Sequence, residues 1–167
     1  SDGDVVDLDG RPVLTFGGLP TGSYHLGVKH RNHLGIRSSA SQSYTVNGAS
    51  VVYDFTTSQA AAYQDPSITT NPAQRDLGGG KFGMHGGNGA KGSTLGQNTV
   101  RASGAPAIND YTFLLNTLGS NTQVGPIYSD ADYNMNGTVR ASGAPAINDY
   151  TFLLGVLGSN TAITSHQ

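Results

Sequence analysis

Side chains that carry oxygen alternate along the stretch DADYNMNGTV, residues 130–139. Every second residue from Asp130 to Asn136 is Asp or Asn, and Gly137 follows the last of them. A hard cation such as Ca²⁺ takes roughly six to eight oxygen ligands, and calcium loops supply them from alternate residues around a glycine turn. We therefore expect a calcium ion here. Its ligands would be the side chains of Asp132, Asn134 and Asn136 and the main-chain carbonyl of Thr138.

The acidic residue that usually closes such a loop, about eleven residues after the first ligand, is missing, because Gly143 occupies that position. Asp149, which follows the inserted sequence SGAPAI, is the best substitute, and Asp130 is a further ligand candidate. The alternative is an Asx-rich turn without metal. Because two of the expected ligands are uncharged Asn side chains, the affinity should be modest and suited to extracellular calcium concentrations.

The segment TVRASGAPAINDYTFLL occurs twice, and residues 99–122 match residues 138–161 at 22 of 24 positions. Two such units are too few for a solenoid, so we expect them to pack about a pseudo-twofold axis. The first copy keeps Asp110 in the place of Asp149 but lacks the acidic run before it. Counting back from Val100 places Ser93, Leu95 and Gln97 at its ligand positions, which does not predict a full site. The alternative is a site rebuilt after a loop insertion from Asn88 and main-chain carbonyls, with Asp110 and Asn98 as weaker ligand candidates.

Each copy also predicts a short helix. Asn109 or Asp110 can cap the sequence DYTFLLNTLG, and Gly119 can end it; Asn148 and Gly158 repeat these positions in the second copy. Leucines form an apolar stripe on both helices. Because two short helices cannot bury these leucines alone, we expect the helices to pack on each other.

Residues 1–57 predict β structure. Asp9-Gly10 and Asn47-Gly48 are hairpin turn signals between short apolar runs. The stretch SYHLGVKHRNHLGIR, residues 23–37, alternates apolar and polar residues and predicts one long strand. About five strands are expected, which favours a small β-sandwich of the immunoglobulin or prealbumin type with an open edge.

The expected fold is therefore mainly β with a small α part. We expect a β-sandwich domain over residues 1–75, a glycine-rich connector with the degenerate first loop over residues 76–97, and the duplicated module over residues 98–167. The connector should lack regular structure, because glycine is dense in it.

The HRNH sequence is the main hint of catalysis or transition-metal binding. On a strand, His30 and His33 would point to opposite faces, with His30 in the core. Neither these residues nor any other set supplies a nucleophile with its base, so we expect no enzymatic activity and no zinc site.

Composition limits the other function classes. All 11 acidic residues are Asp, the net charge is −2, and the basic residues are scattered, so a nucleic-acid partner is not expected. No apolar run approaches the ~20 residues of a membrane span. Cysteine is absent, so bound metal is a plausible substitute for disulfides in a secreted chain.

The duplicated loop-and-helix segment, with its D-x-N-x-N-G-T-V loop followed by ND, resembles a dockerin-type module. The wider chain, through VVDLDGRPVLTFGGLPTGSYHLGVKHRNHLGI and DLGGGKFGM, is similar to C-terminal regions of large secreted Bacteroidetes-type surface proteins. This resemblance implies a β-sandwich followed by a calcium module, an extracellular or cell-surface location, and no catalytic role. In dockerins, residues late in each loop meet a cohesin partner; the positional equivalents are Ala102, Ser103, Ala141 and Ser142.

The function expected from these features is that of a calcium-stabilised structural or adhesive extracellular protein. An open sheet edge would let it assemble into a homopolymer by strand pairing, and the C-terminal TAITSHQ contains a β-favouring run that could pair with such an edge. The alternative is a module that binds a glycan or a cohesin-type surface protein, with Tyr128 and Tyr133 as the aromatic candidates, unless Tyr133 packs over the loop.

Overall fold

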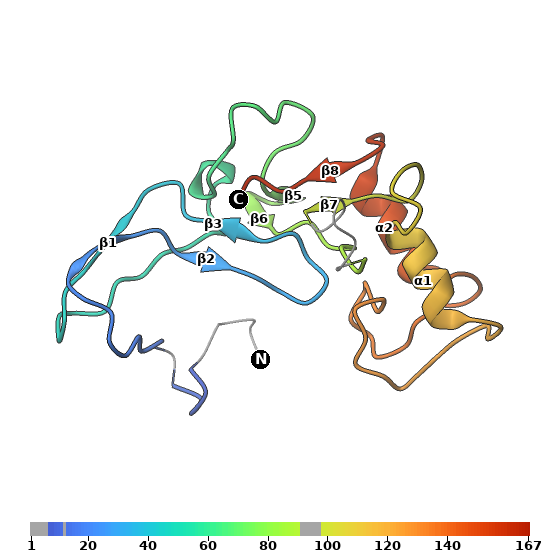
Figure 1. Ribbon diagram of the computed structural model, residues 1–167, viewed down its shortest axis with the longest axis horizontal. Coiled ribbons are helices and arrows are strands. Elements are labelled where there is room, and N and C mark those ends of the chain that lie inside the picture. The colour runs from blue at the N-terminus through green and yellow to red at the C-terminus, as the bar shows by residue number, and fades with distance from the viewer. Residues whose placement is uncertain (1–6, 12, 91–97) are drawn as a thin grey trace.

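The computed structural model describes residues 7–11, 13–90 and 98–167, which form eight short strands, two α-helices and one 3₁₀-helix (Figure 1). Strands predominate in number and helices are few, in agreement with the expected mainly-β class with a small α part. No helix within these ranges is long and apolar enough to cross a membrane. The elements are β1 Gly22–Tyr24, β2 Gly27–Val28, β3 Ile36–Arg37, β4 Gln42–Tyr44, η1 Gln59–Ala61, β5 Arg75–Gly78, β6 Lys81–Gly83, β7 Thr99–Val100, α1 Asp110–Leu118, α2 Asp149–Leu157 and β8 Ile163–Thr164.

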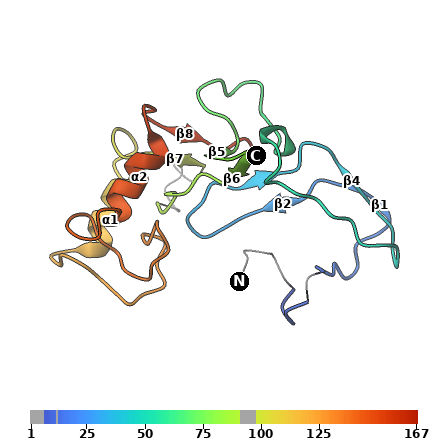
Figure 2. The ribbon, with the colours of Figure 1, turned by 180° about the vertical axis from the view of Figure 1, so that it is seen from behind.

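The strands pair into four separate antiparallel sheets of two strands each: β1 with β4, β2 with β3, β5 with β6, and β7 with β8. The β1–β4 pair lies at one end of the molecule and the two helices lie side by side at the other, as both views show (Figures 1 and 2). The pair of larger packed sheets expected for a β-sandwich is thus not confirmed within the described residues.

The long strand expected over residues 23–37 is wrong. The chain instead turns between β2 and β3, which pair with each other as a hairpin. Residues 85–88 stabilise this turn through main-chain hydrogen bonds. The amide of Leu34 donates to the carbonyl of His85 (2.8 Å), and the amide of Asn88 donates to the carbonyl of Asn32 (3.0 Å). The alternation of buried and half-buried side chains nevertheless persists from Arg31 to Ser38, so the pattern identified extended chain but not its partners.

The chain turns at both predicted glycines, but within the described residues neither turn joins two paired strands as the expected hairpins would. The amide of Gly10 donates to the carbonyl of Asp7 and that of Gly48 donates to the carbonyl of Thr45, each at 2.8 Å. Asn47 adopts the left-handed conformation, with φ of 57°. However, β4, which precedes the second turn, pairs back to β1 rather than to the residues after the turn.

The connector is more ordered than its composition predicts. Its first part forms the β5–β6 hairpin, in which Gly78, Gly79 and Gly80 all have positive φ. The following residues 85–90, which we call the glycine segment, are all buried. A side chain at Gly89 would lie 2.7 Å from the ring of Tyr133 and 2.8 Å from the carbonyl of Asp130. Glycine is needed here because neighbouring atoms leave no space for a Cβ, not because the segment is a linker.

One core joins the N-terminal part to the duplicated module. Leu34, from the N-terminal part, belongs to the same buried cluster as the leucines of both helices. The other members include Val100, Leu114, Leu118, Tyr133, Val139, Leu153, Leu157 and Ile163. A smaller cluster of Ile36, Ala62 and Ala73 lies beneath the N-terminal part. The domain boundaries expected near residues 75 and 97 stay a prediction.

The two copies interact reciprocally. Val100 of the first loop pairs with Ile163 after α2, and Val139 of the second loop pairs with Val124 after α1, at positions related by the repeat. Tyr111 and Tyr150, also equivalent, stack with ring centroids 4.4 Å apart. Such exchanged contacts agree with the expected pseudo-twofold packing. The C-terminal run of TAITSHQ, expected to pair with an edge, does so with β7 of its own chain.

Gly89→Ala should lower the free energy of unfolding by about 1–3 kcal/mol, because its methyl group would force the glycine segment away from Tyr133. Gly155→Ala is the matched control, because a Cβ there meets nothing within 4 Å and lies inside α2. It should raise stability by about 0.5–1 kcal/mol. Urea unfolding of both variants checks this pair, and an unchanged midpoint for Gly89→Ala would contradict the packing described.

Candidate metal centre

The two helices begin in the same way. Asn109 and Asn148 are the N-caps, and each accepts the amide of the residue three positions later in a capping box completed by Thr112 or Thr151. The expected caps are therefore confirmed. Asp110 or Asp149 then occupies the first helical position with its side chain buried rather than in solvent.

Asp149 ties the middle of the second loop, and the residue that follows the loop, to α2. One carboxylate oxygen accepts the amide of Asn134 (3.1 Å) and the other accepts that of Arg140 (2.8 Å). Burial raises the pKa of Asp149; the amide donors oppose this effect, and the nearby carboxylate of Asp132 adds to the rise. The structure thus places Asp149 at the loop expected to need a closing acid, beside the first expected ligand.

The loop folds around its own oxygens. The carboxylate of Asp132 accepts the amides of Asn136 (3.1 Å) and Gly137 (2.9 Å). The side-chain oxygen of Asn134 also accepts the Asn136 amide (3.1 Å), and that of Asn136 accepts the amide of Thr138 (2.9 Å). Met135 and Gly137 have positive φ, which curves the chain so that these bonds can form. The alternation read from the sequence is therefore a real geometric feature.

Each of these oxygens retains acceptor capacity. A carboxylate has about four lone-pair sites and an amide oxygen about two, so one or two main-chain donors leave room for a cation. The amide nitrogen of Asn134 donates to the carbonyl of Ile147 (3.1 Å), which fixes the orientation of the Asn134 side chain. These observations fit the oxygen donor set that a calcium ion requires.

Two residues from the N-terminal part hold the loop and were not predicted. Asn32 donates from its side-chain nitrogen to the carbonyl of Asp132 (2.5 Å). The guanidinium of Arg31 lies 3.5 Å from the carboxylate of Asp132 and 3.9 Å from the centre of the Tyr128 ring. These contacts span about a hundred residues of sequence, so no local pattern could have indicated them.

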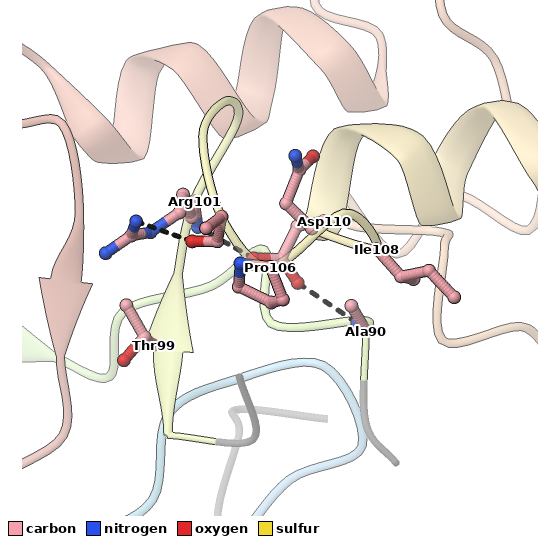
Figure 3. A pocket seen from close by; sticks show the side chains of 8 residues that line it. Ala90, Thr99, Arg101, Pro106, Ile108 and Asp110 are labelled. Carbon is pink, nitrogen blue, oxygen red and sulfur yellow. Dashed lines mark hydrogen bonds between the residues drawn. The ribbon is translucent and has the colours of Figure 1, made fainter. Parts of the chain in front are cut away.

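The Asp110 carboxylate of the first copy has three main-chain donors: Gly89 (2.9 Å), Ala90 (3.0 Å) and Arg101 (2.7 Å). Figure 3 shows the bond from Ala90. Burial raises the pKa of Asp110 to about 6 in spite of these donors. The sequence does not place the glycine segment beside Asp110.

Gly89 and Ala90 occupy the place that Tyr133 and Asn134 have beside Asp149. By this register Asn88, which is buried, takes the place of Asp132, and the first loop is longer than the second. The register counted back from Val100 is therefore wrong. Ser93, Leu95 and Gln97 lie outside the described residues, and Asn98 is exposed.

The remaining candidates, Asp130, Tyr133 and Tyr128, differ in how far they are buried. Asp130 is half-buried beside the glycine segment, and its role as a further ligand stays a prediction. Tyr133 is fully buried and donates its hydroxyl to the carbonyl of Asp110 (2.7 Å), so it packs over the loop and is not available to a glycan. Tyr128 is largely exposed.

Small pockets lie beside both loops at matching positions. The first is lined by Ala90, Thr99, Arg101, Ala105, Pro106, Ile108, Asn109 and Asp110 (Figure 3). The second is lined by Gln123, Asn136, Thr138, Arg140, Pro145 and Asn148. Four lining positions are equivalent in the repeat, so the segment that contains the inserted SGAPAI sequence lines a similar pocket in each copy. In both copies the arginine donates to the carbonyl of the alanine before the proline.

Among the described residues, no three His, Cys, Asp or Glu side chains are arranged to hold a metal ion. The donor set expected from the loop sequence is different, because it includes Asn side chains and a main-chain carbonyl. Such a donor set suits calcium better than softer metals.

Asp110→Asn should lower the free energy of unfolding by about 1–3 kcal/mol, because an amide in this place turns one NH₂ group toward buried main-chain donors. The matched control is Asp76→Asn, where the exposed carboxylate also accepts an amide, from Gly78, and the change should stay within ~0.5 kcal/mol. Unfolding measured in a calcium chelator separates this effect from metal binding. Equal midpoints for the two variants would contradict a structural role of Asp110.

No protein-family model matches this chain, and no curated protein or solved structure matches it significantly. The resemblance to dockerins therefore stays a prediction that depends on the loop and the repeat.

Proposed function

We propose that this chain is a non-enzymatic extracellular structural or adhesive module that one calcium ion stabilises. The observation that carries the proposal is the closed second loop, in which Asp132, Asn134, Asn136 and Thr138 alternate. Asp149, at the start of α2, accepts the amides of Asn134 within the loop and of Arg140 just after it. In dockerin-like terms, this is a calcium loop whose closing acid has moved to the helix start.

Charge supports calcium at this loop. Asp132 and Asp149 are both buried, and Arg31 at 3.5 Å is the cation that the described structure pairs with Asp132. Burying two carboxylates is costly unless nearby cations compensate. A bound calcium ion supplies two positive charges and accepts the remaining lone pairs. The two uncharged Asn ligands keep the affinity in the range of extracellular calcium modules, at a Kd of about 10⁻⁴–10⁻³ M.

The extracellular structural role draws on different features. The chain has no cysteine, so its short two-stranded sheets are not held by disulfides and a bound metal is a suitable substitute. The β1–β4 pair leaves open edges, and apolar side chains near it are exposed: Val13, Leu14, Phe16, Val46, Val51 and Val52. Such a surface favours self-association by strand pairing.

A protein-binding module of the cohesin-partner type is the second candidate. It is favoured by exposed apolar residues at equivalent positions of the two copies, Ile108 with Ile147 and Leu115 with Leu154. A duplicated apolar surface can present similar contacts to a partner in two orientations. The glycan alternative loses Tyr133 as a contact residue, because that side chain is buried.

Calorimetric titration should find one calcium ion per chain. Asp132→Asn should weaken binding at least about tenfold, because it removes charge from the first ligand, whereas Asp76→Asn, which changes an exposed carboxylate elsewhere, should leave binding unchanged. At ten times the Kd, calcium should add about 1.4 kcal/mol to the free energy of unfolding of the native sequence. Binding that survives Asp132→Asn unchanged would contradict the proposed site.

Self-association should depend on the β1–β4 end. Light scattering after size exclusion should give a mass that rises with protein concentration, and Val46→Lys with Val52→Lys should reduce the rise by placing charges on the exposed surface. The urea midpoint should not change, because both side chains are exposed. Leu115→Lys on α1 is the control at the other end of the molecule, and a strictly monomeric native chain would exclude assembly.

A further inference from the structure

The HRNH turn gathers three donor atoms that the sequence appeared to separate. His30 Nδ1 lies 2.9 Å from His33 Nδ1, and the side-chain oxygen of Asn32 lies 3.1 Å from the first nitrogen and 2.9 Å from the second. The expectation that the two histidines face opposite sides is therefore wrong, since residues 30–33 form a turn and not a strand. His30 is also exposed rather than in the core.

The three distances match the ligand set of a transition metal. Zinc binds imidazole nitrogen and oxygen at about 2.0–2.2 Å. Tetrahedral coordination would separate two ligands by roughly 3.3–3.6 Å, whereas two ligands at right angles in tetragonal or octahedral coordination are separated by √2 times the bond length, roughly 2.8–3.1 Å. All three donor pairs of the turn fall in this range, so one ion could contact His30, Asn32 and His33 as three adjacent ligands.

Hydrogen bonding alone does not suit this arrangement well. A neutral imidazole carries its hydrogen on one nitrogen, and the oxygen of Asn32 can only accept. If one Nδ1 donated to the other, the accepting nitrogen and the Asn32 oxygen would face each other at 2.9–3.1 Å with lone pairs only. If both donated to that oxygen, two N–H groups would lie side by side with their nitrogens 2.9 Å apart. A metal ion accepts all three lone pairs at once and removes this conflict.

The surroundings fix one ligand and leave the site accessible. Asn32 is fully buried, and its nitrogen donates to the carbonyl of Asp132, so its oxygen is held toward the histidines. The rings of His30 and His33 meet edge to face at 81°. The neighbouring Arg31 directs its guanidinium to Asp132 and Tyr128 instead. His30 is exposed and His33 half-buried, so water or a partner's side chain could complete the coordination.

We propose that the HRNH turn binds a divalent first-row transition ion, of the zinc, nickel or copper class, through His30 Nδ1, His33 Nδ1 and the side-chain oxygen of Asn32. Imidazole nitrogen selects these ions over calcium. The site is distinct from the calcium loop, although Asn32 touches both. Metal at the turn would fix the contact between the N-terminal part and the second loop.

The test is a zinc titration of the full chain in saturating calcium, so that calcium occupies the second loop and zinc binding there is not counted. One zinc ion should bind, and His30→Ala and His33→Ala should each weaken binding at least about tenfold. His25→Ala is the matched control, because His25 is exposed on the neighbouring extended segment and bonds to the carbonyl of Ser38 (2.8 Å). It should bind zinc like the native sequence.

Long-range ¹H–¹⁵N NMR of the native chain tests the same site without relying on the folding of any variant. Zinc should shift the Nδ1 resonances of His30 and His33 in the native chain and leave those of His85 and His166 in place. Absence of zinc binding in the native chain would overturn the proposal, as would equal affinity in the His30 and His33 variants or shifts confined to other histidines. Calcium titration of the same samples reports separately on the second loop.

Discussion

The structure depends most on two buried carboxylates held by main-chain amides. Asp110 and Asp149 stand at the first position of their helices, and each receives donors from residues that precede it in the chain. A buried carboxylate without such partners would cost several kcal/mol, so its donors must stay in place. Each aspartate therefore fixes a loop against a helix start, and the reciprocal β7–β8 and Val124–Val139 pairings then bring the two units together.

The glycine segment transmits this constraint to the rest of the chain. Its residues Gly89 and Ala90 donate to Asp110, and its residues His85 and Asn88 form main-chain hydrogen bonds with Leu34 and Asn32 of the turn. The HRNH turn also contacts the second loop, through Asn32 and Arg31. The N-terminal part, the connector and both repeats thus share one network, in which the calcium proposed at the second loop would add its charge next to Asp132 and Asp149.

Local features could be predicted from the sequence, and long-range ones could not. The Asn caps, the glycine helix ends, the two turns and the alternating loop oxygens follow from short-range stereochemistry, and all of them are present. The β2–β3 hairpin was missed because residues 23–37 alternate like one strand, while contacts to His85 and Asn88 decide where the chain turns. The burial of residues 85–90 was missed because dense glycine indicates a linker when its packing partners are unknown. His30 and His33 were predicted on opposite faces for the same reason, because the contacts that turn the chain between β2 and β3 could not be known.

The calcium assignment can be tested residue by residue with ¹H–¹⁵N NMR of the native chain during calcium addition. The account predicts that the amides of residues 132–138 and of Asp149 shift together and saturate with one ion per chain, whereas those around Asp110 move little. Shifts centred on Asp110 and Asn88, or no saturable shift at all, would contradict the central claim that the second loop is the calcium site.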